Sequence, residues 1–188
     1  MTTLTLRQSG VTLIELLVAL AILTITLGIS VPAIDSLIQA NTKAHTVNNY
    51  FGIFAYARHQ AVTTRTITAV CPLDANNQCI DDWNRPVSVF PDSNRDGHPD
   101  NQEIWRMVEP GSNHLSIHSR TSGRGSLHFG PDGMVHGAAG SIVICPDDLS
   151  TGHMTYVAVS RGGRARKVTD DDGDGIIRLS WGGVVRCR

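Results

Sequence analysis

The sequence lacks the short motifs that identify many enzymes. It contains no Gly-x-Ser-x-Gly nucleophile elbow, no Walker-type phosphate-binding loop and no His-Glu-x-x-His pair. Its acidic residues are concentrated in loop-like stretches, and scattered serines, histidines and aspartates occur in any chain of this length. No solenoid-type repeat recurs along the chain. We therefore expect a structural or binding protein and no enzymatic activity.

The chain also lacks an overall excess of either charge. Its formal net charge is −1 for 188 residues, so the protein as a whole is not electrostatically committed to binding nucleic acid. The distribution is uneven, because seven of the sixteen lysines and arginines lie between residues 161 and 188. The overall charge therefore conceals a local basic bias in the C-terminal part.

The N-terminal stretch combines a polar leader with a long apolar run. Residues 1–10 have no apolar core, so they are not an ordinary secretory signal, whereas residues 11–34 are long enough to span a bilayer as a helix. The run contains one ionisable residue, Glu15, which should have a partner in the membrane. Cutting the chain after Gly10 would create an amino group at Val11, one helical turn from Glu15. A plain membrane anchor would leave this spacing unexplained.

This pattern resembles the prepilin family of type IV pilins, minor pilins and type II secretion pseudopilins, in which a leader ending in Gly precedes Thr-Leu-Ile-Glu-Leu. Here Val11 stands where Phe is usual. The resemblance implies that a prepilin peptidase cleaves after Gly10 and methylates Val11. It also implies that Glu15 neutralises a terminal amine as the helix assembles with other pilins or pseudopilins. The anchor would cross the bacterial inner membrane once, with its head in the periplasm and later in the filament.

The chain has four cysteines, and an even number of cysteines in an exported chain favours disulfides. The spacing of Cys71 and Cys79 suits a small closed loop, which leaves Cys145 to pair with Cys187. Three connectivities are possible, and this is the one we predict. Zinc binding is the alternative, although there is no close Cys-x2-Cys pair.

Helical periodicity continues beyond the apolar run. Residues 35–62 show an apolar stripe, which predicts an amphipathic half of the same helix packed on a sheet. The stripe comprises Leu37, Ala44, Val47, Phe51 and Phe54. One long helix on a globular head is also what the family resemblance implies.

Residues 63–188 alternate between short apolar strands and turn residues, which predicts a mostly antiparallel β-rich head and an α+β fold. The family resemblance implies that this fold is of the type IV pilin kind. The expected strands are Thr66–Cys71, Pro86–Phe90, Glu103–Val108, Leu115–Ser119, Ser126–Phe129, Met134–His136, Ser141–Cys145, Thr155–Ser160, Arg164–Thr169, Ile176–Leu179 and Val184–Cys187.

Two acidic stretches follow the spacing of a calcium-binding loop. The first satisfies D-x-[DN]-x-[DN]-G-x5-E completely, and alternating oxygen ligands around a glycine can surround a hard cation. Its candidate ligands are Asp92, Asn94, Asp96, His98, Asp100 and Glu103. The second stretch, Asp170–Gly175, has only the opening half, with Trp181 in place of the closing acid. Because Asp, Asn and Gly also favour turns, a polar loop without metal is the alternative for both.

A basic hairpin is the third candidate site. Two glycines form the turn, and a period of two would place Arg164 and Arg166 on one face of the returning strand. Guanidinium groups bind phosphate oxygens bidentately, so the predicted ligand is a phosphate backbone, bound without sequence preference and weakened by salt. The candidate residues are Arg161, Gly163, Arg164, Arg166 and Lys167. A solvated strand end is the alternative, and the acidic run that follows would weaken a phosphate site unless it is neutralised.

The sequence Gly163-Arg164-Ala165-Arg166 resembles the Gly-Arg-x-Arg motif of FimT-like minor pilins, which bind DNA during natural transformation. The anchor, the acidic loop and the closing hairpin together resemble the GspH/FimT family. The resemblance implies a minor pilin that supports filament assembly and contacts DNA. The alternative is a purely structural tip pseudopilin of type II secretion. No cofactor is expected other than calcium.

Overall fold

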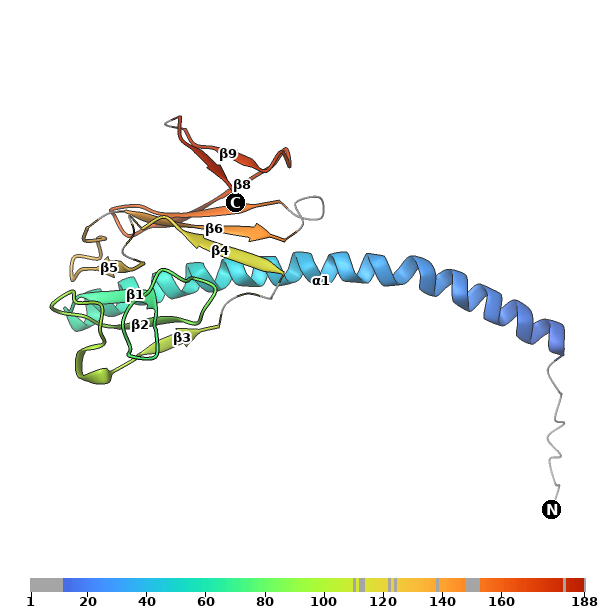
Figure 1. The fold of residues 1–188 in the computed structure, drawn as a ribbon, viewed down its shortest axis with the longest axis horizontal. Helices are drawn as coiled ribbons and strands as arrows, with labels where there is room; N and C mark the ends of the chain where they lie inside the picture. Colours follow the sequence, from blue (N-terminus) through green and yellow to red (C-terminus); the bar gives the residue numbers. More distant parts are fainter. Residues whose placement is uncertain are drawn as a thin grey trace, which may run out of the picture. The chain divides into compact units, whose positions relative to one another are not determined.

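The computed structural model describes residues 12–109, 111, 114–121, 123, 125–137, 139–147, 153–180 and 182–187. The chain divides into two compact units, residues 1–38 and residues 39–188, which are described in turn. A single long helix, α1 (Leu13–Thr64), begins in the first unit and ends in the second (Figure 1).

The first unit consists of the apolar part of α1. Its segment Leu13–Val31 has a mean hydropathy of 2.4, and none of its residues is buried inside the protein. By length and composition this segment is able to cross a membrane, since about 20 apolar residues span the hydrocarbon layer. Its leucine, isoleucine and valine side chains are exposed in the isolated chain.

The second unit begins with the remainder of α1, which buries one stripe against the head. Val47, Tyr50, Phe54, Ala57 and Ala61 are each at most 4% exposed. Their spacing of three and four residues places them on one helix face. The predicted stripe was therefore wrong at its start, because it included Leu37 and Ala44, which lie before this buried face.

Leu37 is 60% exposed and Ala44 is also exposed, whereas Tyr50, Ala57 and Ala61 were not included in the prediction. The helix ends two residues later than predicted, at Thr64, and Arg65 follows with a positive φ of 56°. A left-handed residue at this position is a common way to terminate a helix.

The strands form two four-stranded sheets and a separate hairpin, and every pairing is antiparallel as predicted. The first sheet, in the order β3-β2-β1-β5, contains β1 (Thr68–Pro72), β2 (Val87–Pro91), β3 (Arg106–Val108) and β5 (Leu127–Phe129). The second, in the order β4-β6-β7-β8, contains β4 (Leu115–Ser119), β6 (Gly140–Pro146), β7 (Thr155–Val159) and β8 (Ala165–Thr169). The hairpin pairs β9 (Ile176–Arg178) with β10 (Val184–Arg186).

Three apolar clusters are buried among the described residues, and the smallest surrounds the Cys71–Cys79 disulfide. The main core joins the buried stripe of α1 to both sheets and includes Trp83, which is fully buried between Tyr50 and Phe54. A second core lies on the other face of the β4-β6-β7-β8 sheet, where Val143 and Tyr156 meet the hairpin. We call this the outer face. Figure 1 shows β9 on the side of the sheet away from α1.

Two predicted strands differ from the structure. Residues 134–136 make only the single bridge Phe129↔Val135, because Val135 donates its N–H to the carbonyl of Arg161 (2.8 Å). The expected strand Glu103–Val108 starts at Arg106, since the short helix η1 (Asp100–Gln102) precedes it and contains the left-handed residue Asn101. The remaining strands agree with the prediction to within two residues at each end.

Candidate functional site

Thr12 and Glu15 define the start of α1. The Glu15 N–H donates to Thr12 Oγ1 (3.3 Å), and the Leu16 N–H donates to the Thr12 carbonyl (3.1 Å). Thr12 is thus the N-cap, and Thr-x-x-Glu is the sequence of a capping box. This local signal was overlooked in the sequence. Gly10 and Val11 lie outside the described residues.

Both predicted disulfides are present. Cys71 and Cys79 have Cα atoms 5.6 Å apart, and those of Cys145 and Cys187 are 5.7 Å apart. The first closes a loop after β1, and the second joins β6 to the end of β10. All four cysteines are therefore oxidised and do not form a zinc site.

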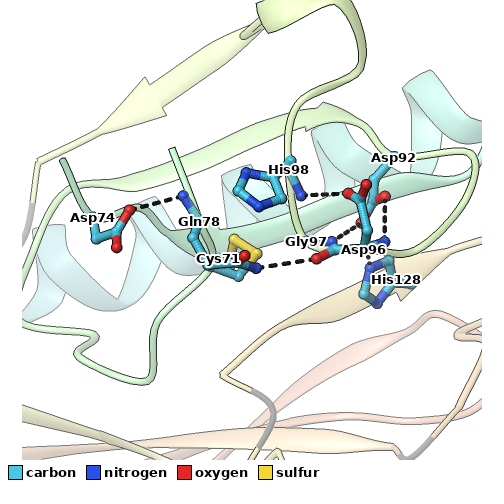
Figure 2. The surroundings of a disulfide bond; sticks show 9 residues. Cys71, Asp74, Gln78, Asp92, Asp96, Gly97, His98 and His128 are labelled. Carbon is cyan, nitrogen blue, oxygen red and sulfur yellow. Dashed lines mark hydrogen bonds and ion pairs between the residues drawn. A yellow bond between two sulfur atoms is a disulfide. The ribbon is translucent and has the colours of Figure 1, made fainter. Parts of the chain in front are cut away.

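The first acidic loop is organised around a fully buried carboxylate, Asp92. Its Oδ1 accepts the N–H of Asp96 (3.1 Å), and its Oδ2 accepts the N–H of Gly97 (3.1 Å). His128 Nε2 on β5 lies 2.8 Å from the same Oδ2. The Gly97 carbonyl in turn accepts the N–H of Cys79 (2.9 Å), which fastens the loop to the disulfide (Figure 2).

The other predicted ligands of this loop are also engaged in hydrogen bonds. Asp100 accepts the N–H and the hydroxyl of Ser93, and Glu103 accepts the Trp105 indole N–H (2.8 Å). Asp96 accepts the N–H of His98 (2.8 Å), which together with the Asn94 side chain lowers the pKa of the Asp96 carboxyl. The His98 ring is directed away from the Asp92 and Asp96 carboxylates (Figure 2).

The second acidic loop has a similar hydrogen-bond scheme. Asp170 is buried, and its two carboxylate oxygens accept the N–H groups of Gly173 (3.0 Å) and Gly175 (2.9 Å). Asp172 accepts the N–H of Asp174, just as Asn94 accepts that of Asp96 in the first loop. The common pattern Asp-x-[Asp/Asn]-x-Asp-Gly therefore has one structural meaning in this chain.

The two loops differ in how closely their acidic groups approach one another. Among the described histidines, cysteines and acids, only Asp170, Asp172 and Asp174 have potential ligand atoms that all lie within 4.8 Å of one another. The Arg178 guanidinium lies 2.6 Å from Asp174 Oδ2 and 3.7 Å from Asp172 Oδ2. This ion pair is the main cause of the lowered pKa of Asp174. The second loop therefore provides the closer set of oxygen ligands.

The basic hairpin is the connection of β7 to β8, and its turn is docked on the rest of the head. Gly163 is buried with a φ of +70°, and a Cβ there would lie 2.1 Å from the Gly133 carbonyl oxygen. Arg58 of α1 donates from Nε to the same carbonyl (3.0 Å). Gly163 therefore acts through its backbone: it lets the turn pack closely against the Gly133 carbonyl. This packing fixes the position of the neighbouring arginines.

The four basic residues of the hairpin are exposed, but they do not share one face. Arg164 precedes β8 and lines a groove of about 580 Å³ with Arg58 and His59 of α1. Arg166 pairs with Ala158 and lines a separate cavity of about 230 Å³ on the outer face. The prediction that Arg164 and Arg166 point to the same face is wrong, because β8 begins only at Ala165.

Lys167 lies on the side of α1. Its backbone pairs with that of Val157, a residue of the main core. The pKa of Lys43 is lowered, mainly by partial burial and to a smaller extent by the positive charge of Lys167, whereas Asp170 raises it. Lys43 also donates to the His153 carbonyl. Lys43, Arg58 and His59 were not foreseen as neighbours of the hairpin, since no sequence signal connects α1 with residues a hundred positions later.

Comparisons with known proteins agree with this architecture. Residues 46–163, more than half of the chain, match the family described as type II transport protein GspH. Residues 5–31 match the prokaryotic N-terminal methylation motif. A comparison with curated proteins found no significant match.

Several solved structures are similar. The type IV minor pilin FimU of Pseudomonas aeruginosa strain PAO1 matches in one crystal form with a TM-score of 0.56 and 18% identity, over 68% of this chain and 89% of FimU. A second crystal form matches with a TM-score of 0.52 and 17% identity, over 66% and 91%. The minor pseudopilin EpsH from the Type 2 Secretion System of Vibrio cholerae has a TM-score of 0.45 and 12% identity, over 66% and 94%.

The family match, the methylation motif and the α+β fold lead to one assignment. The apolar helix and the family together indicate membrane anchoring. The chain belongs to the GspH family and is a minor pilin or pseudopilin, a structural component of a type IV pilus or a type II secretion system rather than an enzyme.

Proposed function

We propose that the chain crosses the bacterial inner membrane once, with residues 39–188 in the periplasm, and that a prepilin peptidase cleaves after Gly10 and methylates Val11. The methylation motif over residues 5–31 and the apolar segment Leu13–Val31 support this processing. Glu15 then neutralises a terminal amine, its own or that of a neighbouring pilin subunit, in the helical core of the filament. The intact mass of the protein from membranes tests the cleavage, and retention of Met1 would contradict it.

We propose further that the head binds the phosphate backbone of duplex DNA for uptake in natural transformation. The observation that carries this proposal is the exposed basic hairpin Arg161–Lys167 beside the free edge strand β8. Arg58 and His59 add basic groups to the groove beside Arg164. Arginine is suited to this role because its planar guanidinium binds phosphate bidentately.

The acidic run beside the hairpin does not remove this basic surface. Asp172 and Asp174 are paired with Arg178, and Asp170 is buried and accepts backbone N–H groups. Asp171 accepts the hydroxyl of Thr169 (2.7 Å). Arg178 therefore offsets one of the four carboxylate charges, and the calcium ion proposed below would neutralise most of the rest.

Arg164→Gln/Arg166→Gln is expected to weaken binding of residues 39–188 to duplex DNA. Log affinity falls linearly with log salt concentration, and loss of two phosphate contacts should make this slope less steep by roughly two. Fluorescence anisotropy with a labelled duplex, across a salt series, measures both quantities. Arg85→Gln/Arg95→Gln is the matched control, since it removes the same charge from exposed positions on either side of β2.

Equal weakening by both double variants would mean that net charge alone governs binding, and would refute a hairpin site. If wild-type protein shows no binding even at low ionic strength, the alternative holds: a structural tip pseudopilin of the GspH type in type II protein secretion. Pilus assembly genes or secretion genes beside the coding sequence separate these two roles.

Calcium is the one cofactor that we propose, and the second acidic loop is its preferred site. Three carboxylates with oxygens within 4.8 Å of one another match the oxygen ligands that calcium takes. Calcium binding by the first loop, residues 92–103, stays a prediction, and its candidate ligands are more dispersed.

Calorimetric titration of residues 39–188 with calcium is expected to show binding that Asp172→Asn weakens at least about tenfold, because one ligand charge is lost. Asp171→Asn is the matched control, since Asp171 is exposed and lies outside the acidic group. Binding that survives Asp172→Asn but disappears in Glu103→Gln would place the ion in the first loop. Absence of binding to the wild type would refute both sites.

A further inference from the structure

A second basic pocket lies on the outer face, at the opposite edge of the sheet from the hairpin. Its volume is about 550 Å³, and its basic lining residues are His118 and Arg120 at β4 and Arg186 on β10. Val143, Val184 and Val185 supply its apolar lining. The volume falls within the range of small-molecule binding pockets.

The second core and a disulfide set the positions of these basic side chains. Val185 is buried in the core beneath the hairpin, so the strand alternation turns Arg186 away from that core. The next residue, Cys187, is bonded to Cys145 of β6, and Cys145 is paired with Ser116 of β4. The Arg120 N–H donates to the carbonyl of Ser141 (2.8 Å). The arginines are therefore presented by β10, which the disulfide ties to β6, and by the end of β4, which is paired with β6 through backbone hydrogen bonds.

The charge of this pocket is not balanced by acids. No aspartate or glutamate lines it, and within the described residues neither Arg120 nor Arg186 forms an ion pair. Arg178 at the other side of the β9–β10 hairpin differs, because Asp172 and Asp174 take up its charge. The β4–β10 pocket thus presents two arginines and a histidine to an anion.

We propose that the β4–β10 pocket is a second phosphate-binding site, which holds a backbone phosphate of the duplex that the hairpin engages. β4 and β8 are three strand spacings apart, or about 14 Å at about 4.8 Å per spacing. That is less than half of a DNA helical turn of about 34 Å, so one duplex reaches both sites. This inference rests on the proposed DNA binding and extends it from the β8 edge of the sheet to the β4 edge.

The test uses the full chain in a neutral detergent and a labelled duplex, with anisotropy measured across a salt series. Arg120→Gln/Arg186→Gln is expected to weaken binding at about 50 mM salt by at least about fivefold and to lower the salt slope by roughly two. The effect should add to that of Arg164→Gln/Arg166→Gln, since the two sites share no residue. Arg85→Gln/Arg95→Gln again controls for net charge, and unchanged circular dichroism confirms the fold.

The outcomes separate this site from the hairpin. Wild-type affinity and slope in Arg120→Gln/Arg186→Gln, with weakening only in the hairpin variant, would overturn the pocket and leave the DNA function intact. Weakening only in the pocket variant would support the pocket and overturn the hairpin. A wild-type chain that binds no duplex overturns both. If polyglutamate competes with the labelled duplex for the pocket as strongly as tripolyphosphate does, phosphate recognition would be overturned in favour of an acidic peptide.

Discussion

Cys145→Ala/Cys187→Ala is expected to lower the free energy of unfolding of residues 39–188 by about 4 kcal/mol. The disulfide spans 42 residues, and closing a loop of that length restricts the unfolded chain by about this amount. For a domain of this size, the melting temperature should fall by roughly 8–16 °C. Urea denaturation followed by circular dichroism measures the change.

Cys71→Ala/Cys79→Ala is the comparison, since that bond spans only 8 residues and should contribute about 2.5 kcal/mol. A larger loss from the shorter loop would show that strain or local packing, rather than loop entropy, decides the contribution. The Cys145–Cys187 variant should also lose the DNA contacts of the β4–β10 pocket, because Arg186 is adjacent to the missing bond.

Gly163→Ala is the second change with a large expected effect, about 2–4 kcal/mol of unfolding free energy. The left-handed backbone is strained for alanine, and the new Cβ overlaps the Gly133 carbonyl, whose position is held by Arg58. The turn must therefore move away from α1, which also displaces Arg164. Urea denaturation measures the stability, and DNA binding measured beside it should weaken although no charge is removed.

Gly162→Ala provides the matched control one residue earlier in the same turn. A Cβ at Gly162 meets only Ser160 Oγ at 3.9 Å, and this glycine has no positive φ. We expect a change within about 0.5 kcal/mol, as for an ordinary surface substitution. Equal losses in the two variants would contradict the docking of the turn through Gly163.

The two acidic loops illustrate how far a motif predicts structure. Their shared spacing correctly predicted two polar loops, and the structure shows that the first aspartate organises each of them. In both, that residue is buried and accepts two backbone N–H groups, so the pattern acts first as a scaffold for the turn. How closely the other carboxylates approach one another depends on neighbours such as Arg178 and Ser93, which spacing does not reveal.

The buried stripe of α1 shows a similar division. Periodicity predicted one helix with one apolar face, because a period of 3.6 residues is a property of the helix itself. It did not predict where the head begins to cover that face, so Leu37 and Ala44 were included and Ala57 and Ala61 were omitted. Small residues such as alanine become informative only when the distance between the helix and the sheets is known.

The sequence by itself determined the anchor motif, the helix, the positions of most strands and the basic hairpin, and it favoured the cysteine pairing that the structure shows. These depend on local spacing, on backbone preference and on the reactivity of cysteine. Only the tertiary structure decided that Arg164 joins Arg58 and His59 while Arg166 faces the other side of the sheet. It alone brought Arg120 and Arg186 together, since their meeting requires the pairing order of β4, β6, β7 and β8 and the packing of β9–β10 on that sheet. Contacts between distant residues follow from the packing of the whole head, and no local pattern records them.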